Sequence, residues 1–443
     1  MWKTKIKGFP TLFLLANSIS WFSLTMLVIG DFVAGRPLSE ILLISGAYFG
    51  GLIGSAAFGA TLLYQKLRKK GFLLSWILFG ALSCLLFTIG ITNDAPSLSV
   101  ASLVLGISTG IGIPTCFSFF AKQTRVENRG KIGAIMFFIV QLFSALIIVL
   151  ESSVSTDYQF LVLSVWRLFG IAGLAGLTIY KPLEKASEER ATTIKSIVKE
   201  RTFILYFLPW FLFTLVNFIE APILEAGFGE QILNDSLIAG TLISSLSAFI
   251  GGALCDIKGR KIAGILGFVL LGLGYAFLSF FSGGATREIA LYLYIICDGI
   301  AWGILFVTFI FILWGDLSEE KVREKYYFIG SLPFLFSGMI QMLIQSFAQK
   351  IDITTSFSLA SFFLFLAIVP LLYATETLPE KAMKDRDLKS YLDKAQKIVQ
   401  KKEDKSHKKN KKEKKQVYEA PKAESEENAE EYDEARKLAE KYY

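Results

Sequence analysis

The chain has 443 residues, of which 53% are hydrophobic and 39 are phenylalanine, and its formal net charge is +7. Apolar runs of about 20 residues, each long enough to cross a bilayer, recur over the first 375 residues. This pattern excludes a soluble protein built around a water-excluded core and predicts a polytopic membrane protein. The basic residues gather beside these runs and in the C-terminal tail, so they indicate membrane topology and not a nucleic-acid partner.

The membrane part of the sequence lacks the residues that several kinds of chemistry require. The only histidine, His407, lies in the lysine-rich tail, which leaves none for metal binding, haem ligation or acid–base catalysis. The four cysteines form no C-x-x-C pair, and no G-x-x-x-x-G-K-(S/T) loop is present for ATP. We therefore expect no enzyme activity, no metal and no cofactor.

Twelve apolar runs follow one another along the chain, and each predicts one membrane-spanning helix. In order, the runs cover residues 9–30, 38–64, 71–91, 97–121, 132–150, 159–180, 202–219, 236–254, 262–281, 289–315, 326–347 and 355–374. The first run is longer than a signal-peptide core, and no small-residue cleavage site follows it, so we expect it to be retained.

Basic residues are unevenly divided between the two sides of the predicted membrane region. Outside the tail, the loops on the N-terminal side hold 23 lysines and arginines, whereas the alternate loops hold three, Arg36, Arg287 and Lys350. Because basic loops stay on the cytoplasmic side of a membrane, we expect both termini in the cytoplasm of a plasma-membrane protein.

The first six runs and the last six runs repeat one another. Glycines 193 positions apart form five pairs: Gly59 with Gly252, Gly71 with Gly264, Gly90 with Gly283, Gly106 with Gly299 and Gly110 with Gly303. A shift of 189 positions also places Trp21 on Trp210, and Asp31 on Glu220. The two halves are therefore expected to share one layout.

A charged, glycine-bearing loop lies between the eighth and ninth runs. Residues 252–261 read Gly-Ala-Leu-Cys-Asp-Ile-Lys-Gly-Arg-Lys, in which the glycines permit a tight turn at the membrane surface. The loop resembles the signature G-x-L-x-D-(R/K)-x-G-R-(R/K) of the major facilitator superfamily. The matching residues are Gly252, Leu254, Asp256, Gly259, Arg260 and Lys261. Ile257 stands where a basic residue is usual.

Two other segments bear on this resemblance. The corresponding loop of the first half keeps Gly59 and a basic cluster but has Leu63 where the family has an acid. Any gating charge of the motif therefore rests on Asp256, which we expect to pair with basic groups or with the helix N-terminus near Gly130. Residues 375–380, Thr-Glu-Thr-Leu-Pro-Glu, resemble the P-E-T tail of sugar and organic-ion porters.

The resemblance implies an all-α integral membrane protein. Its twelve transmembrane helices would form two pseudo-symmetric six-helix bundles, with a substrate site at their interface. The implied division places the bundles at residues 1–180 and 202–380, joined by a cytoplasmic linker, 181–201. A charged cytoplasmic tail, 381–443, has too few apolar residues for a core and is expected to be disordered or partly helical.

In this family, helices one, four, seven and ten line the central cavity. The polar and aromatic residues of those helices are the expected lining: Asn17, Ser20, Trp21, Ser108, Thr109, Tyr206, Trp210, Thr214, Asn217, Tyr294, Asp298 and Trp302. Ordinary helix packing remains the alternative for each aromatic residue taken singly. The residues expected to act on gating are Gly252, Asp256, Gly259, Arg260 and Lys261.

Two ionisable residues lie deep within the predicted spans, where a charge costs roughly 2.5 to 3.5 kcal/mol to insert. Asp298 is expected near mid-membrane, where it would exchange a proton or pair with a cationic solute. The alternative is a structural acid bonded to Ser108 or Thr109. Arg167 lies on a helix that faces mostly lipid in the family, so we expect it to snorkel toward the outer headgroups.

Small and acidic residues suggest further roles. Asp31 and Glu220 lie near outer helix ends and are expected to form an outer ring of acids. Glycines at four-residue spacing are expected to let helices two, four and ten pack closely. These glycines are Gly46, Gly50, Gly54, Gly106, Gly110, Gly299 and Gly303.

Together, these features predict a secondary active or facilitative transporter that moves a small organic solute by alternating access, with proton symport left open. We expect a monomer in the lipid bilayer. The tail is expected to be solvated, or to attach to anionic lipids or a partner through its lysines. The alternative function is a transport-inactive membrane sensor or scaffold that acts through this tail.

The predicted topology can be tested by single-cysteine labelling. In a variant without the four natural cysteines, Ser97→Cys and Ser153→Cys should react with an impermeant maleimide from outside intact cells. Lys66→Cys should react only after the membrane is opened. Labelling of either serine position from the inside alone would contradict the count of twelve spans.

Overall fold

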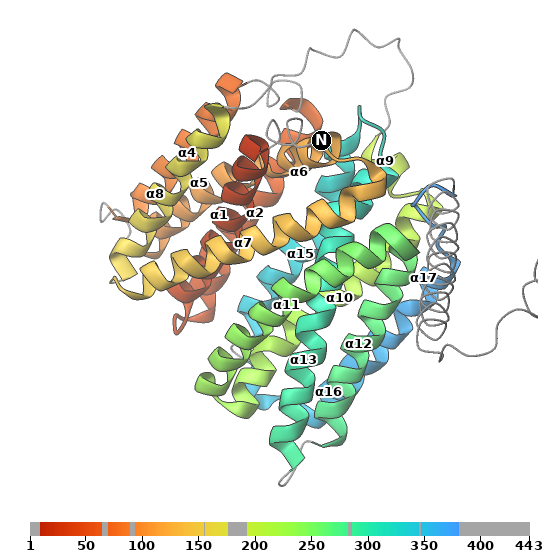
Figure 1. Ribbon diagram of the computed structural model, residues 1–443. Helices are drawn as coiled ribbons and strands as arrows, with labels where there is room; N and C mark the ends of the chain where they lie inside the picture. The colour runs from red at the N-terminus through yellow and green to blue at the C-terminus, as the bar shows by residue number, and fades with distance from the viewer. Residues whose placement is uncertain are drawn as a thin grey trace, which may run out of the picture. The chain divides into compact units, whose positions relative to one another are not determined.

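The computed structural model describes residues 9–63, 70–88, 94–154, 156–175, 193–281, 286–344 and 347–380, and these residues form helices and no strands (Figure 1). The chain divides into two units, residues 1–380 and 381–443. The tail, 381–443, and the first part of the linker, 181–192, lie outside the described residues. The expectations for both segments therefore stay predictions.

The helices of the first half follow the first six apolar runs closely. They are α1 (Phe9–Val33), α2 (Leu38–Phe58), the π-helix η2 (Gly59–Leu63), α4 (Lys70–Thr88), α5 (Ala95–Gly110), α6 (Ile113–Gln123), the 3-10 helix η3 (Val126–Asn128), α7 (Arg129–Ser152) and α8 (Thr156–Ala175). The short helix α9 (Ile194–Ile197) follows in the linker.

The second half contains the remaining six spans. Its helices are α10 (Arg201–Phe228), α11 (Glu230–Lys258), α12 (Arg260–Phe280), α13 (Arg287–Phe306), the π-helix η5 (Val307–Leu313), α14 (Trp314–Leu317), α15 (Arg323–Ile344), the 3-10 helix η6 (Ala348–Lys350), α16 (Ile353–Leu366) and α17 (Ile368–Tyr373).

Length and hydropathy allow eleven of the described helical segments to cross a membrane. The sixth predicted run corresponds to α8, whose apolar part, Tyr158–Leu174, is shorter, and the end of that run, 176–180, lies outside the described residues. The all-α membrane fold predicted from the sequence is confirmed. The protein is a multi-pass membrane protein.

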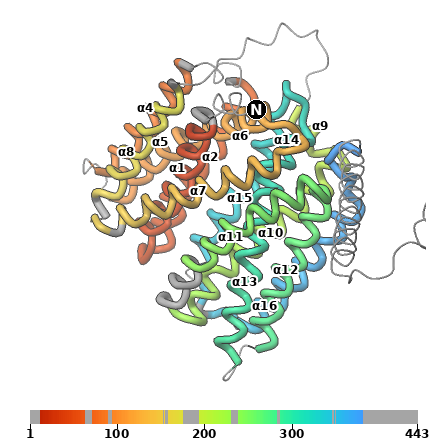
Figure 2. The backbone as a smooth tube through the Cα atoms, viewed as in Figure 1, coloured from red at the N-terminus to blue at the C-terminus, as the bar shows by residue number. Residues whose placement is uncertain are grey.

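The helices form two groups that meet along two matching seams. In Figure 1, α1 to α8 lie in the upper left and α10 to α17 in the lower right, with α7 crossing the front between them, and the tube in Figure 2 traces the same arrangement. Helix α7 packs on α11 of the other half, and α2 packs on α15. Because α2 and α11 are repeat-related, as are α7 and α15, the two seams are the same contact made twice.

The loops that are rich in lysine and arginine gather at one end of the described helices, which we call the basic end. Arg129 at the start of α7 contacts Asp316 of α14, and Arg260 at the start of α12 contacts the Val126 carbonyl. Acids cap helices at the opposite end: hydrogen bonds from the hydroxyl and the N–H of Ser97 hold the pKa of the Asp94 carboxyl below its usual range.

Only some of the predicted glycines bring helices together. A Cβ on Gly106 would meet the Tyr48 carbonyl oxygen of α2, and one on Gly303 would meet the Ser244 carbonyl oxygen of α11. Gly110 and Gly299 lie against the same two helices. The prediction is wrong for Gly46, Gly50 and Gly54, which face open space because the side of α2 that meets α5 carries Gly51 instead.

Two repeat-related spans, the fourth and the tenth, are each interrupted at a similar distance along the span. Helix α5 ends at Gly110, and α6 starts after a turn at Gly112 with Pro114 in its first turn, where proline is tolerated. In the second half, α13 passes at Val307 into the π-helix η5, where the Thr308 hydroxyl bonds the Ile304 carbonyl oxygen at 2.7 Å. Such breaks near mid-membrane are typical of transporter sites.

The close contact between α2 and α5 predicts different outcomes for two glycines. Gly106→Ala should lower the melting temperature of the purified protein, because the added methyl meets backbone and overpacking costs about 1–3 kcal/mol. Gly50→Ala, on the open face of α2, is the matched control and should leave the melting temperature unchanged. Equal melting temperatures for the two variants would contradict the packing described for Gly106.

Candidate functional site

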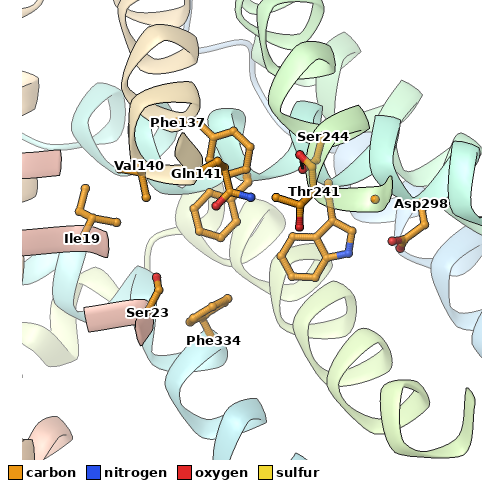
Figure 3. Close-up of a pocket in the computed structure, with 12 residues that line it drawn as sticks. Ile19, Ser23, Phe137, Val140, Gln141, Thr241, Ser244, Asp298 and Phe334 are labelled. Carbon is orange, nitrogen blue, oxygen red and sulfur yellow. Dashed lines mark hydrogen bonds between the residues drawn. The ribbon is translucent and has the colours of Figure 1, made fainter. Parts of the chain in front are cut away.

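A cavity of about 240 Å³ lies between the two halves (Figure 3). Its polar lining residues are Ser23, Gln141, Thr241, Ser244 and Asp298. Its aromatic lining residues are Phe137, Trp302, Phe306 and Phe334. These side chains come from α1 and α7 of the first half and from α11, α13 and α15 of the second half. A molecule in this cavity would therefore touch both halves.

Asp298 is the only ionisable residue among the lining residues that the structure describes. It lies 11 residues into α13, about 16 Å from the N-terminal end of that helix. Figure 3 shows it on the side of the cavity opposite Ile19 and Ser23. Its Oδ1 atom is buried and has no hydrogen-bond partner among the described residues. An unpaired carboxylate oxygen beside a cavity can accept a proton or a donor group of a ligand.

Of the twelve predicted lining residues, only Asp298 and Trp302 line this cavity. The five predicted residues of the first half are fully buried inside that half: Asn17, Ser20, Trp21, Ser108 and Thr109. Asn17 donates to the Trp166 carbonyl oxygen at 2.6 Å, and Ser108 bonds the Ser83 hydroxyl at 2.7 Å. Thr109 donates within its own helix, so neither helix-four hydroxyl bonds Asp298.

The remaining five predicted residues are buried within the second half: Tyr206, Trp210, Thr214, Asn217 and Tyr294. Tyr206 donates to the Thr375 carbonyl oxygen at 2.8 Å, and Trp210 donates to the Gly330 carbonyl oxygen at 2.9 Å. Thr214 accepts a bond from another hydroxyl of the same half at 3.2 Å. For the three aromatic residues among them, the structure has the helix packing that the sequence left as the alternative.

The prediction that Arg167 snorkels to the headgroups is wrong. Its side chain has no exposed surface and lies between the rings of Trp21 and Trp76, 4.6 and 4.1 Å from the ring centroids. It donates to the Ser18 hydroxyl at 2.9 Å and to Asn17 Oδ1 at 3.2 Å. Helix α8 turns this face toward α1 and α4, where two aromatic faces attract the cation.

The prediction that Asp31 and Glu220 form an outer ring of acids is also wrong in part. The run that was expected to end at residue 219 continues as α10 to Phe228, so Glu220 lies two turns inside a helix. It is 5% exposed, and it accepts a hydrogen bond from the Ser356 hydroxyl at 2.7 Å. Asp31, by contrast, is exposed near the end of α1.

Four polar lining residues were missed: Ser23, Gln141, Thr241 and Ser244. Gln141 was detectable, because it is a lone amide in the middle of a strongly apolar run. Thr241 and Ser244 begin a series of small hydroxyl residues along α11. They were passed over because the family expectation concentrated on helices one, four, seven and ten.

The basic end of the cavity is closed by aromatic side chains from both halves. A small apolar chamber of about 30 Å³ continues from the cavity toward this end. At this level Phe117 of α6 stacks on Tyr327 of α15 with ring centroids 5.4 Å apart. Phe120 meets Phe311 of η5 edge to face, also at 5.4 Å. These ring contacts join the two halves on the basic-end side of the cavity.

Nearer the basic end, Asp256 caps a helix of the other half. Its carboxylate accepts the backbone N–H groups of Gly130, at 2.8 Å, and Lys131, at 3.0 Å, in the first turn of α7. These donors have no partner within their own helix, and the positive end of the helix dipole adds to the attraction. Gly130 and Gly252 permit the approach, because a Cβ on either would meet the carbonyl oxygen of the other.

A second buried carboxylate, Asp316, holds two arginines together. Arg260 donates to it at 2.7 Å, and Arg129 of the first half forms an ion pair with its other oxygen. Arg260 also reaches the Val126 carbonyl oxygen of the first half. All three charged side chains are at most 3% exposed. Asp316 was absent from the predicted site, although it directly follows the tenth predicted run, 289–315, and contacts Arg260 of the predicted loop.

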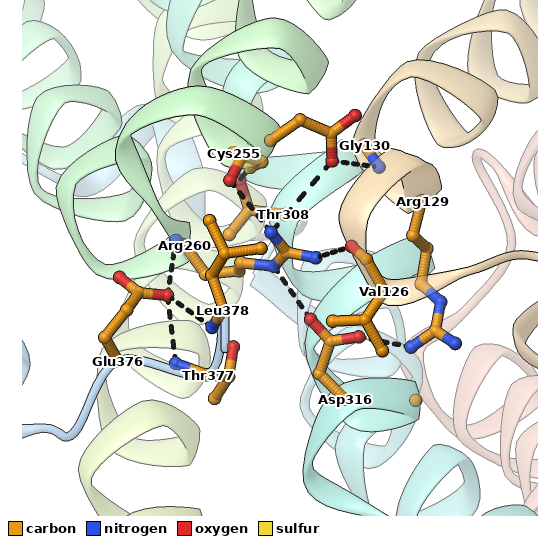
Figure 4. Close-up of polar contacts among 12 residues, drawn as sticks. Val126, Arg129, Gly130, Cys255, Arg260, Thr308, Asp316, Glu376, Thr377 and Leu378 are labelled. Atoms are coloured by element: carbon orange, nitrogen blue, oxygen red, sulfur yellow. Dashed lines mark hydrogen bonds and ion pairs between the residues drawn. The ribbon is translucent and has the colours of Figure 1, made fainter. Parts of the chain in front are cut away.

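Glu376, in the segment that resembles a P-E-T tail, is tied to the same loop. Its carboxylate accepts the backbone N–H groups of Arg260 at 2.9 Å and Lys261 at 3.1 Å, which begin α12 (Figure 4). Gly259 precedes them with a φ of 101°, a conformation that favours glycine. The Lys261 ammonium group bonds the Leu372 carbonyl oxygen at 2.6 Å. The predicted gating residues therefore form one connected network.

Comparisons with known proteins agree with this architecture. Residues 10–325 match the family model described as Major Facilitator Superfamily. None of the curated proteins compared with the chain matches its sequence.

Solved structures with a similar fold share little sequence. The human organic anion transporter MFSD10 is 15% identical, with 84% of this chain and 100% of that chain covered and a TM-score of 0.59. A proton:xylose symporter is 13% identical, with 84% and 95% covered and a TM-score of 0.59. A bacterial homologue of the iron transporter ferroportin, in an outward-facing state, is 14% identical, with 82% and 98% covered and a TM-score of 0.62.

The cap between the halves predicts the effect of Asp256→Asn. The Asn side chain keeps the size of Asp256 but loses its charge, and its NH₂ group faces one of the two N–H groups that the carboxylate accepted. We therefore expect the closed state to be destabilised by about 1–2 kcal/mol, which lowers the equilibrium constant for closure five- to thirtyfold. A single cysteine at Ser23, in the cavity, should then become reactive from the basic end. For an identified solute, turnover should change far more than affinity.

Asp352→Asn is the matched control for this change. Asp352 also caps a helix, α16, but at the opposite end. Hydrogen bonds from the Thr355 hydroxyl and from the Thr355 N–H, at 2.8 Å, hold the pKa of its carboxyl below the usual range. This variant should not alter labelling at position 23. An effect of Asp256→Asn on affinity alone would contradict a gating role.

Proposed function

Because the chain belongs to the major facilitator superfamily of membrane transporters, we propose that it carries a small organic solute through the cavity between its halves by alternating access. The supporting observation is a cavity lined by both halves and closed at one end by contacts between them. Separating those contacts while the outer ends approach would expose the same cavity to the other side of the membrane.

The size of the cavity favours a small solute. A cavity of about 150 Å³ holds benzene, so 240 Å³ suits a molecule of roughly one to two rings. Aromatic faces from Phe137, Trp302 and Phe334 would pack against its apolar part. Hydroxyl and amide groups on α7 and α11 would bond its polar part.

The charge of the cavity favours a cationic or neutral solute. The described lining holds one carboxylic acid and no basic residue, which is a poor match for an anion. A cationic solute could pair with Asp298 and lie against the ring of Trp302. The similar structures were named for an organic anion, xylose and iron, and at 13–15% identity that fold likeness selects none of these.

The basic end is the proposed cytoplasmic side of a plasma-membrane protein. Arg129 and Arg260 lie in loops of the kind that stays cytoplasmic. With that end closed, the structure would correspond to a state that serves the outer side. No ATP motif is present, so the driving force would be a solute or proton gradient.

A solute can be found before its transport is measured. A library should be screened for compounds that raise the melting temperature of the purified full chain, because a ligand that binds only the folded state stabilises it. Hits should then be tested for counterflow in proteoliposomes. Stabilising hits without any counterflow would support a sensor in place of a transporter.

Asp298→Asn separates the two roles proposed for this acid. If Asp298 binds a cation, affinity for a cationic hit should fall about tenfold or more, since a hydrogen bond to a charged group contributes about 1.5–3 kcal/mol. If it carries the coupling proton, accumulation driven by a pH gradient should vanish while counterflow survives. Asp31→Asn, an exposed acid on α1, is the control. Normal transport by Asp298→Asn between pH 5 and 8 would exclude both roles.

A further inference from the structure

The cavity between the halves and the small apolar chamber beside it share part of their lining. Both spaces are bordered by Ile19, Ser23, Phe306 and Phe334. The residues that border the chamber alone are apolar except for Ser331, whose hydroxyl donates to the Phe328 carbonyl oxygen at 2.9 Å. The two spaces therefore form one site with a polar part and an apolar part.

The acid of the site lies far from the chamber. In Figure 3, Asp298 is on the side of the cavity opposite Ile19 and Ser23, which also border the chamber. Phe306, a third residue shared by both spaces, follows Asp298 by eight positions, which is about 12 Å along α13. A solute that reached both the acid and the chamber would therefore be elongated.

The polar groups of the site gather around the acid. Helix α13 packs closely on α11 here, and a Cβ on Gly299 would lie 3.1 Å from the Gly240 carbonyl oxygen. Thr241 and Ser244 of α11 line the cavity on this side (Figure 3). Ser244 donates to the Thr241 carbonyl oxygen at 3.0 Å, so its own oxygen keeps lone pairs that can accept.

These oxygens suit an ammonium group. Oδ1 of Asp298 is buried and has no hydrogen-bond partner among the described residues. An ammonium group has three N–H donors and no acceptor, so it can bond the carboxylate and a neighbouring hydroxyl together. Trp302, one turn further along α13, adds an aromatic face that attracts a cation.

Three rings form a continuous aromatic wall from the acid to the chamber. Trp302 stacks on Phe306 with ring centroids 6.0 Å apart, and Phe306 meets Phe334 edge to face at 5.9 Å. All three line the cavity, and the last two also line the chamber. A hydrocarbon chain laid along this wall would lie against apolar surface over its whole length.

The chamber is the size of a small alkyl group. Its volume of about 30 Å³ equals the share of one water molecule in the liquid, which is also close to the size of a methyl group. Leu52 and Ala56 of α2, Phe117 of α6 and Ile310 of η5 surround it. A water molecule needs two to four polar partners, so this lining favours a methyl group over water.

We propose that the site binds an amphipathic amine, a cation with a single hydrocarbon chain. Its ammonium group pairs with Asp298, its chain lies along the aromatic wall, and its terminal methyl group fills the chamber. This inference rests on the proposed transport function and deepens it, because it names the class of the solute and its orientation. The fixed separation of acid and chamber makes the site a measure of chain length.

Chain length is tested with n-alkylamines from propyl to decyl, which are cationic at pH 7.5. Apparent affinity is taken from the concentration dependence of the melting temperature of the purified full chain. It should rise with each carbon to a maximum and then fall about tenfold for the next carbon, because an extra methylene has no room in the chamber. A rise without a maximum would overturn the proposal.

The chamber is tested by two substitutions with opposite effects. Ala56→Val adds two methyl groups to its lining and should move the optimum to an amine at least one carbon shorter. Ile310→Val removes one methylene and should move it one carbon longer. The controls, Ala57→Val and Ile312→Val, make the same changes at neighbours that do not line the chamber, and should keep the optimum. An unchanged optimum in both folded chamber variants would overturn the role of the chamber.

The ionic end is tested with n-alcohols of the same lengths. The wild-type chain should bind each amine about tenfold or more tightly than the matching alcohol, since a hydrogen bond to a charged group is the stronger kind. Asp298→Asn should abolish this preference and leave the optimum length unchanged. Equal binding of amines and alcohols by the wild-type chain would overturn the pairing with Asp298.

Failure of this inference differs from failure of the proposed function. If no amine of the series raises the melting temperature, the amphipathic amine is the wrong class, whereas counterflow of another solute would still support transport. If the amines bind with the expected optimum but show no counterflow, the site is upheld and the chain is a sensor for them.

Discussion

Asp316 lies without exposed surface between Arg129 of one half and Arg260 of the other. In water such ion pairs contribute little, because solvent replaces the lost partner. Here no solvent reaches them, and a buried charge left without its partner costs about 3–5 kcal/mol. Opening this end therefore requires water to enter while four residues separate together: Arg129, Arg260, Asp256 and Asp316. The stability of the closed state of the cavity depends on this requirement.

The sequence predicted the helices well because the bilayer imposes one rule on every span. Backbone groups in lipid must bond within their own helix, so each apolar run of sufficient length becomes a helix whatever its neighbours are. The runs from 9–30 to 355–374 all correspond to described helices. The loop at residues 252–261 was informative for a similar reason, since Asp256 and Arg260 are charges that can lie beside a membrane only where partners exist.

The lining of the cavity could not be predicted in the same way. Which side of a helix faces the cavity depends on its rotation, and an apolar run in lipid carries little information about rotation. Trp21 and Trp210 are repeat-related, and both proved to be packing residues inside their own halves. Arg167 was misplaced because nothing in its own helix shows the rings of Trp21 and Trp76 that receive it. The contact between Asp316 and Arg129 joins residues 187 positions apart.

The π-helix η5 separates Asp298 on α13 from Asp316 on α14. These two acids are 18 positions apart, and over that length an unbroken α-helix would complete five full turns and point both side chains in the same direction. A π-helical stretch turns the chain through a smaller angle at each residue, so the phase of everything after Val307 is shifted. One helix can therefore direct one acid to a cavity and the other to a seam between the halves. The extra residues in this short segment set the angle between the two directions.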